Sequence, residues 1–297
     1  MNERKPDRVG QVFAALGKSV CYVALFLGMQ ILVMLPVMFS AVVAALLEGD
    51  EDAVYAFLDA NAMVYSMISG LLTLAIVLLF YLIRRKKFSE ALMLRRVPAP
   101  TLLTGAALAP GLYVVISVAL AMLPESWLES YMEASEGIDS GTWAGVVAVA
   151  LVAPVVEELI FRGLVMNRLS RVMPGWLAVV LSAAVFGVCH GHPVWFAYAF
   201  VLGSIFGFID LRAGSIWPSI LGHVAFNAIS QILSVIPETE EGTEAVAAMG
   251  VLLVIGIVAP LVNRKAIAAL FRPVPKAAPV EEMPAKPKNY DYDPWDL

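Results

Sequence analysis

The sequence predicts an all-α polytopic membrane protein with about eight transmembrane helices. Its 297 residues are 60% hydrophobic and only 15% charged, and the mean hydropathy is +0.80. An ordinary soluble domain is about 45–50% apolar and about 25% charged, so this composition excludes that class. Crossing the hydrocarbon layer takes roughly 20 apolar residues in a helix, and several such stretches follow one another along the chain.

Eight apolar stretches have the length and composition of membrane spans. We expect them at residues 19–47, 62–83, 101–123, 143–169, 176–190, 194–211, 214–236 and 245–262. The fifth and sixth stretches are short, so they could end within the membrane. The first stretch is too long for the apolar core of a cleavable signal peptide, and we expect it to be a span.

Lysine and arginine alternate between the two ends of these stretches. Basic residues occur in the N-terminal segment, at 84–96, at 168–171, at 212 and at 264–272, whereas the connections between these positions contain none. Such alternation is what the positive-inside rule predicts for eight spans with both termini in the cytoplasm. We expect a multi-pass protein of the plasma membrane in this orientation.

The fourth stretch contains charges where a lipid-spanning helix normally has none. A charge at membrane depth costs several kcal/mol unless it is paired or faces a polar cavity. In an α-helix, Glu158 and Arg162 are neighbours at i and i+4, whereas Glu157 points away from Arg162. Arg162 can therefore neutralise Glu158, and Glu157 becomes a candidate general base. Pro154 lies about one turn earlier and is expected to free the carbonyl of Ala150.

Two further pairs with i, i+4 spacing occupy other apolar stretches, Phe186 with His190 and His223 with Asn227. A histidine at a helix end is more often structural than catalytic, and His223 with Asn227 could be an interhelical hydrogen bond. Phe186 is expected to shape a pocket wall. His192 is a weaker candidate than His190, because it lies in a connection between stretches.

Depth in the membrane favours a shared site. At 1.5 Å per residue, Glu157 lies about 18 Å, His190 about 21 Å and His223 about 14 Å from the predicted cytoplasmic end of its own stretch. Convergent polar groups in an apolar setting are the usual pattern of an active site. Gly-xxx-Gly steps at 187–191 and 203–207 are expected to let helices approach closely around it.

These motifs resemble those of the membrane-embedded CAAX-processing and bacteriocin-processing endopeptidase (CPBP) family, which includes type II CAAX prenyl proteases and Abi-like proteins. The family motifs are Glu-Glu-xxx-Arg, Phe-xxx-His and His-xxx-Asn, and the resemblance covers roughly residues 143–236. The matching residues, in motif order, are Glu157, Glu158 and Arg162; Phe186 and His190; and His223 and Asn227.

The resemblance implies an intramembrane endopeptidase that hydrolyses a peptide bond of a membrane-associated, prenylated or leader-bearing substrate. In this scheme Glu157 acts as general base on a water molecule, aided by His190. His223 and Asn227 stabilise the oxyanion, and preorganised donors of this kind are usually the largest catalytic term. The implied supporting residues are Glu158, Arg162 and Phe186.

The sequence leaves the dependence on a metal cofactor open. Similar proteins are commonly described as metalloproteases, and Glu157, His190 and His223 could supply a three-ligand zinc site with an open position. The chain lacks the His-Glu-xx-His helix motif that places two imidazoles on one face. A glutamate-activated water without a metal is the alternative, so we assign no cofactor.

Two other functions compete with a peptidase. The first is a non-catalytic membrane immunity or scaffold protein of the same fold, although every motif residue is present. The second is a transporter that uses the buried carboxylates for protons or cations, although the chain shows no inverted repeat of the kind many transporters have. As partners we expect a peptide or protein substrate and the lipid bilayer, and no nucleic acid.

We expect the chain to divide into four parts. These are a cytoplasmic N-terminal segment at 1–18, three spans with their loops at 19–142, a catalytic membrane core with the last helix at 143–262, and a cytoplasmic, disordered tail at 263–297. The end of the chain is rich in Pro, Lys, Glu and Asp and poor in large aliphatic residues, which is typical of disorder.

Overall fold

The computed structural model describes residues 8–48, 51–135, 142–234 and 243–272, and within these ranges every regular element is a helix. The prediction of an all-α fold is therefore confirmed. The longer helices are α1 (Arg8–Glu48), α2 (Glu51–Ile83), α5 (Thr104–Ala121), α10 (Gly175–Val188), α11 (Pro193–Ala213), α12 (Trp217–Ser234) and α13 (Thr243–Val262). Shorter helices are α3 (Phe88–Ala91), α4 (Ala99–Leu102), α6 (Glu125–Ser135) and α14 (Arg264–Leu270).

One helical run, residues 143–169, changes its pitch along its length. It consists of α7 (Trp143–Val147), the π-helix η2 (Ala148–Val152), α8 (Ala153–Glu157), the π-helix η3 (Glu158–Met166) and α9 (Asn167–Leu169). Short π-helical turns inside α-helices occur frequently at functional sites. This run carries the first predicted motif, so the change of pitch falls on the residues of greatest interest.

Six helical segments of the described chain are long and apolar enough to cross a membrane, and the protein is an integral membrane protein. They are Val9–Leu47, Asn61–Ile83, Ala99–Ala121, Trp143–Leu169, Pro193–Ala213 and Thr243–Val262. The predicted count of about eight is not confirmed. The stretch expected at 176–190 forms α10, whose 14 residues reach only about 21 Å of a roughly 30 Å core. The stretch expected at 214–236 forms the 18-residue α12, which is not among the six.

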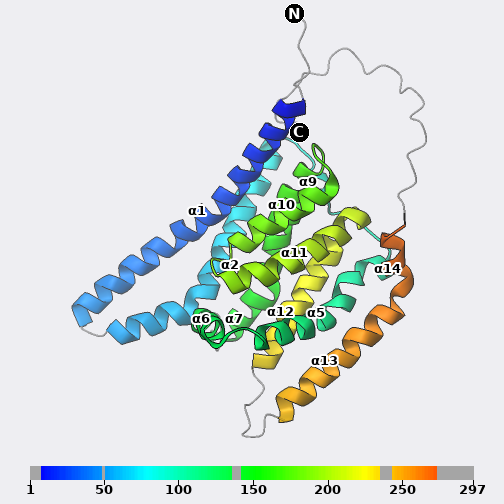
Figure 1. Ribbon diagram of the computed structural model, residues 1–297. Helices are drawn as coiled ribbons and strands as arrows, with labels where there is room; N and C mark the ends of the chain where they lie inside the picture. The colour runs from blue at the N-terminus through cyan, green and yellow to red at the C-terminus, as the bar shows by residue number, and fades with distance from the viewer. Residues whose placement is uncertain (1–7, 49–50, 136–141, 235–242, 273–297) are drawn as a thin grey trace, which may run out of the picture.

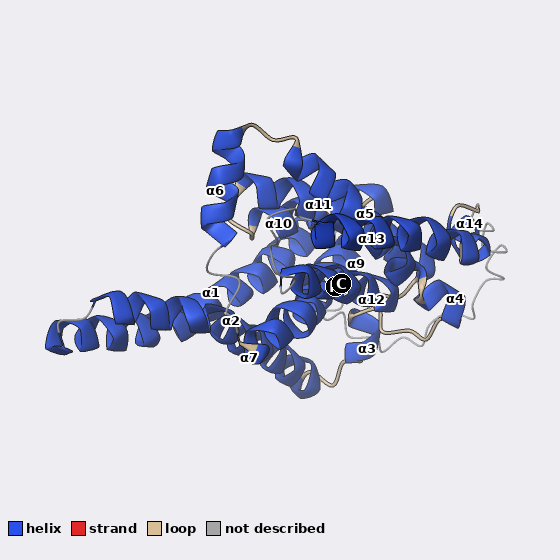
Figure 2. Ribbon diagram, turned by 90° about the horizontal axis from the view of Figure 1, so that it is seen from below, coloured by secondary structure: helices blue, strands red, loops and turns tan. Residues whose placement is uncertain are grey.

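The helices form a bundle with a protruding arm (Figures 1 and 2). Helices α1 and α2 pack along each other, and both views show their joined ends extending away from the other helices. Within the bundle, α10 packs on α11, while α5 lies between α12 and α13. Gly214, with φ +66°, caps the end of α11 in the left-handed conformation, and the short connection to α12 keeps those two helices adjacent.

Glycines allow the closest contacts inside the bundle. A Cβ added at Gly203 would lie 2.9 Å from Nη2 of Arg162, and one at Gly207 would lie 3.2 Å from the nearest side chains. The predicted close approach at 203–207 is therefore confirmed. Gly187 likewise packs closely, but Gly191 faces open space with φ +74°, so the second step contains one packing glycine and one turn glycine.

The end of the described chain differs from the prediction. Residues 264–270 form helix α14, whose Leu270 is 6% exposed and packs in the same cluster as α5 and α11 side chains. The expectation of disorder from residue 263 is therefore wrong for this helix, because its apolar face has a surface to bury against. Residues 273–297 lie outside the described residues.

Candidate active site

The four residues predicted as catalytic line one cavity of about 360 Å³. Glu157 is the last residue of α8, His190 follows α10, and His223 and Asn227 lie on α12. Side chains from α2 and α6 complete the wall. The predicted convergence of the motifs from separate helices is therefore present, while the catalytic roles of these residues stay predictions.

Glu158 and Arg162 form a buried ion pair behind this cavity. Nε of Arg162 lies 3.2 Å from Oε2 of Glu158, and the two side chains are 1% and 0% exposed. The pairing predicted from the i, i+4 spacing is therefore confirmed, although these residues lie in η3 and not in a regular α-helix. Removing one partner of a buried pair leaves an uncompensated charge, so the pair constrains this helix strongly.

His223 lies between the two adjacent carboxylates. Its Nδ1 is 2.9 Å from Oε1 of Glu158, and its Nε2 is 3.7 Å from Oε2 of Glu157. A carboxylate accepts the Nδ1–H proton, which leaves Nε2 of the neutral ring as an acceptor facing Glu157. Glu158 therefore orients His223 as well as pairing with Arg162, a role that the sequence did not indicate.

Asn227 is held by the π-helical turn that precedes Pro154. Its Nδ2 donates a 2.9 Å hydrogen bond to the carbonyl of Val149 in η2. Pro154 lacks an N–H group, and in a π-helix the partner of position 154 is five residues earlier. The sequence predicted a free carbonyl at Ala150, on α-helical spacing; the carbonyl that Asn227 bonds to is one residue earlier, in the π-helical turn.

Phe186 forms the wall that the sequence predicted, between three polar side chains. Its ring lies edge-on to His190 at 4.7 Å and to His223 at 5.8 Å, between ring centroids, and Cζ of Arg162 lies 4.4 Å from its centroid. Its carbonyl is 2.8 Å from Nδ1 of His190. A carbonyl can only accept, so Nδ1 of His190 donates and Nε2 is left as an acceptor.

Asp210 is a site residue that the sequence analysis missed. Its side chain on α11 is fully buried, and Oδ1 accepts a 3.2 Å hydrogen bond from the backbone N–H of Ser219 in the first turn of α12. A carboxylate there satisfies an N–H that the helix itself cannot bond. Asp210 therefore helps to fix the helix that carries His223. A lone carboxylate within the apolar stretch 194–211 was the available signal.

Buried polar atoms cluster behind His223. Within the described ranges, Oδ2 of Asp210 and both terminal nitrogens of Arg162 have no hydrogen-bond partner. The cavity is thus backed by a layer of buried polar groups that lies within the protein.

The outer part of the cavity is aromatic, and the sequence analysis did not single out these residues. Tyr131 of α6 lines it together with Trp195 and Tyr198 of α11. Burial raises the pKa of the Tyr131 phenol above its ordinary value, so this hydroxyl is a neutral hydrogen-bond donor at physiological pH. His192 caps α11 by accepting from the N–H of Val194 and also contacts a serine of α6, which indicates a structural role.

The described residues do not fit the zinc site considered above. Among them no group of three or more His, Cys, Asp or Glu side chains is arranged to hold a metal ion. We therefore assign no catalytic step to a metal.

Comparison with known proteins identifies the same part of the chain. Residues 139–229, which contain all three motifs, match the family model of Type II CAAX prenyl endopeptidase Rce1-like proteins. The "Putative membrane peptidase YdiL" of Bacillus subtilis is 26% identical over 92 residues, which cover 31% of this chain and 38% of that protein. No solved structure matches the chain. The resemblance seen in the motifs is therefore confirmed, and residues 139–229 are similar to Rce1-like proteins.

Proposed function

We propose that this protein is an intramembrane endopeptidase in which Glu157 activates a water molecule for attack on a peptide carbonyl. The observation that carries the proposal is the convergence of Glu157, His190, His223 and Asn227 on one cavity from separate helices. The similarity to Rce1-like proteins and to a protein named as a membrane peptidase supports the same class of activity.

The first step needs a base and a place for water. Oε2 of Glu157 and Nε2 of His223 are 3.7 Å apart, so one water about 2.8 Å from each can hydrogen-bond to both. Glu157 accepts a proton as the water oxygen bonds to the carbonyl carbon. When the His223 ring is protonated, its Nε2 donates to the water oxygen, and the second proton of the water can hydrogen-bond to Nε2 of His190, which the Phe186 hydrogen bond leaves as an acceptor.

The second step needs donors for the oxyanion. The amide of Asn227 has two N–H groups and gives one to Val149, so the other is available for the oxyanion. His223 donates from Nε2 when its ring is protonated, and Glu158 holds the ring in position for this. The tetrahedral intermediate then collapses, the C–N bond breaks, and the proton on Glu157 passes to the leaving nitrogen.

The cavity wall favours an apolar peptide segment. Trp195, Tyr198 and Phe226 line it with aliphatic residues, and Ser230 and Gln231 add hydrogen-bonding groups. A site of about 360 Å³ falls in the usual range for ligand pockets. We propose a membrane-associated substrate, with a prenylated peptide and a leader-bearing peptide as the two classes to test.

The test compares the wild type with Glu157→Gln by mass spectrometry of membrane and exported peptides, with and without a chelator. We expect peptide turnover by the purified protein to fall about 10²–10⁴-fold, the usual contribution of a general base. The fold should be retained, because Gln has the same shape and the Glu157 side chain is 21% exposed. Loss of wild-type turnover with chelator, restored by zinc, would assign a metal.

Glu129→Gln is the matched control, because it makes the same chemical change on exposed α6. We expect this variant to retain full turnover. Equal turnover by wild type and Glu157→Gln would overturn the proposal, and an unchanged cellular phenotype would favour the scaffold function. Charge movement in liposomes without any cleaved peptide would favour a transporter.

A further inference from the structure

The polar lining of the candidate active site continues along α12 beyond the residues assigned to catalysis. His223 and Asn227 are followed on this helix by Ser230, Gln231 and Ser234, and all of these side chains line the cavity. Residues three and four apart lie on one face of a helix, so they form one polar stripe. The stripe is about 16 Å long at 1.5 Å per residue and ends at the last residue of α12. The proposed hydrolysis uses only its first two side chains.

The exposed residues of the lining lie at one end of the cavity. His223 is buried, Asn227 is partly exposed and Ser234 is exposed. Among the described lining residues the other exposed one is Ser66 of α2, near the start of the span Asn61–Ile83. Helix α6 supplies the adjacent wall, and Figure 1 shows it at the end of the bundle away from α9. The cavity therefore reaches the surface at the end formed by α6, the start of α11 and the end of α12, which we call the α6 end.

Packed side chains close the opposite end of the bundle. We call this the α9 end, and it contains residues 84–96, 167–171 and 212–216. Leu164 and Ile216, which lie toward it from the cavity, are 2% and 0% exposed, and Leu92 is fully buried. A Cβ on Gly163 would lie 2.7 Å from Cδ2 of Leu92, and none of these residues lines the cavity. An interior packed as closely as this leaves no passage for a peptide.

Hydrogen bonds fasten the connection between α2 and α4 across the α9 end. Nδ2 of Asn167 in α9 donates to the carbonyl of Ala91 at 2.7 Å. Oγ of Ser215, in the turn between α11 and α12, donates to the carbonyl of Arg95 at 2.7 Å. The connection is therefore bound both to the fourth span and to the turn that leads into α12.

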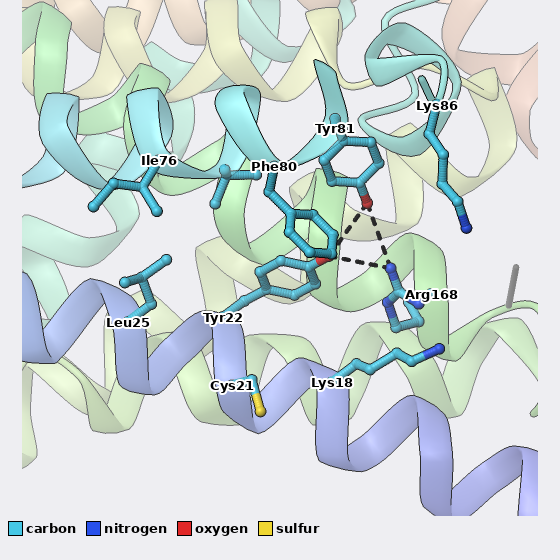
Figure 3. A pocket seen from close by; sticks show the side chains of 10 residues that line it. Lys18, Cys21, Tyr22, Leu25, Ile76, Phe80, Tyr81, Lys86 and Arg168 are labelled. Carbon is cyan, nitrogen blue, oxygen red and sulfur yellow. Dashed lines mark hydrogen bonds between the residues drawn. The ribbon is translucent and has the colours of Figure 1, made fainter. Parts of the chain in front are cut away.

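A cluster of side chains also joins three helices at the α9 end (Figure 3). Nη2 of Arg168 in α9 donates to the hydroxyls of Tyr22 in α1 and Tyr81 in α2, at 3.3 and 3.4 Å. The pocket beside this cluster shares no described lining residue with the candidate active site. Bonds between helices therefore hold the α9 end together, separately from the cavity.

The two ends of the bundle differ in their basic residues. The α9 end contains the lysines and arginines at 84–96, 168–171 and 212, whereas residues 97–161, which include all of α6, contain none. The glutamates of α6 are exposed. The positive-inside rule predicts that the basic end of a membrane protein faces the cytoplasm. The α6 end, and with it the opening of the cavity, is then on the other side of the membrane.

We propose that the candidate active site opens on the non-cytoplasmic side of the membrane and cleaves a polypeptide segment that lies on that side. An extended peptide of about five residues is as long as the polar stripe, so its backbone can bond along the stripe while the scissile bond lies at Glu157. A leader-bearing, exported peptide is then the substrate class, because a prenylated peptide that stays in the cytoplasm has no route to the site. The substrate assignment rests on the proposed hydrolysis, whereas the direction of the opening does not.

The first test measures from which side a reagent reaches the cavity. Ser230→Cys is made in the full-length protein with Cys21→Ala and Cys189→Ala, and spheroplasts are treated with a small, membrane-impermeant methanethiosulfonate. We expect the protein to gain the mass of one reagent adduct by mass spectrometry, without permeabilisation of the membrane. Reaction only after permeabilisation, or no reaction at all, would overturn the proposal.

Two further cysteine variants in the same background are the controls. Ser182→Cys makes the same change at a residue that is 1% exposed and does not line the cavity, so it should stay unmodified on both sides. Arg96 is exposed at the α9 end, and Arg96→Cys should react only in permeabilised membranes. Reaction of Arg96→Cys in intact spheroplasts, or equal reaction of the two serine variants, would overturn the proposal. Unfolding midpoints equal to that of the parent protein establish that the variants are folded.

A second test identifies the side from which the cleaved segments come. Peptides released by wild type but not by Glu157→Gln are mapped by mass spectrometry onto their parent proteins, and we expect them to come from exported or outward-facing segments. Glu157-dependent peptides from cytoplasmic segments would overturn the proposal and leave the proposed hydrolysis intact. Absence of any Glu157-dependent peptide would overturn the hydrolysis and the substrate assignment, while the labelling would still establish the direction of the opening.

Discussion

The central and peripheral spans have similar hydropathy but different surroundings. The two peripheral spans are Val9–Leu47 and Thr243–Val262, with mean hydropathies of 2.4 and 2.7. In the most apolar 18-residue window of each, 6% and 0% of the residues are buried within the protein. The two central spans are Trp143–Leu169 and Pro193–Ala213, with mean hydropathies of 2.1 and 1.8. In their corresponding windows, 39% and 44% of the residues are buried. The buried Glu158, Arg162 and Asp210 all lie on the central spans. Hydropathy therefore identifies the membrane segments, whereas contact with other helices determines where charge is tolerated.

Glycines show the same contrast between centre and periphery. A Cβ at Gly28 of α1 or at Gly250 of α13 would meet nothing within 4 Å, whereas one at Gly222 would lie 2.7 Å from Phe206 and 2.9 Å from Gly105. Gly222 is a place where helix backbones meet, whereas Gly28 and Gly250 are not; on α13 the backbone contact is at Gly256, where a Cβ would lie 2.6 Å from Cα of Gly111. Substitutions in the centre should therefore be much more costly than the same substitutions at the periphery.

The largest expected effect on stability is that of Arg162→Ala. This change leaves the fully buried Glu158 without its guanidinium partner, and breaking a buried pair typically costs about 3–5 kcal/mol. We expect a clearly lower midpoint of thermal or chemical unfolding, together with loss of activity. Arg96→Ala, at an exposed position, should change the unfolding free energy by less than about 0.5 kcal/mol. Identical midpoints for the two variants would contradict the buried pairing.

A double variant separates the two roles of Glu158. Replacing a buried ion pair by apolar residues of similar size is often neutral for stability, so Glu158→Leu with Arg162→Met should regain much of the stability that Arg162→Ala loses. Peptide turnover should stay low, because His223 loses the partner of its Nδ1. Recovery of turnover together with stability would show that Glu158 does not orient a functional His223.

Asn227→Ala should affect activity more than stability. Loss of an oxyanion donor typically lowers the rate about 10²–10³-fold, whereas loss of one amide-to-carbonyl hydrogen bond costs about 1 kcal/mol. Asn263→Ala is the matched control, because Nδ2 of Asn263 donates an equivalent 2.9 Å bond to the carbonyl of Pro100. Turnover and unfolding midpoint should be measured for both. Equal turnover by the two variants would assign Asn227 a structural role alone.

The convergence of the motif residues was predictable because it depends on local spacing and depth. Glu158 and Arg162 pair at i and i+4 as expected, and His190 and His223 reach one cavity because their helices cross the same layer. Paired polar groups in apolar stretches are a strong signal, since an isolated charge is costly there.

Other features depended on tertiary contacts that the sequence does not encode locally. Nδ2 of Asn227, on another helix, donates to the carbonyl of Val149 in the π-helical turn, one residue before the expected position at Ala150. Asp210 has its partner, Ser219, in the next helix, so no local spacing indicated their contact. The predicted count of about eight spans is not confirmed, because α10 has only 14 residues and α12 is not among the six long apolar segments.

Glycine-to-alanine substitutions provide the mildest test of the contrast between centre and periphery. A Cβ at Gly105 would clash with the carbonyl of Pro218 and lie 3.1 Å from Cα of Gly222. Backbone atoms cannot move aside as a flexible side chain can, so Gly105→Ala should destabilise the protein by about 1–3 kcal/mol. It should also lower turnover, because Pro218 and Gly222 lie on the helix that carries His223 and Asn227.

Gly250→Ala makes the same change at a peripheral position and should have the smallest effect of all. No atom lies within 4 Å of the added methyl group, and alanine is favoured over glycine in a helix by up to about 1 kcal/mol. The unfolding midpoint should therefore stay unchanged or rise slightly, with full turnover. A loss of stability as large as that of Gly105→Ala would mean that the open face of α13, which carries Gly250, is packed against something in the membrane, and that this face is an interface.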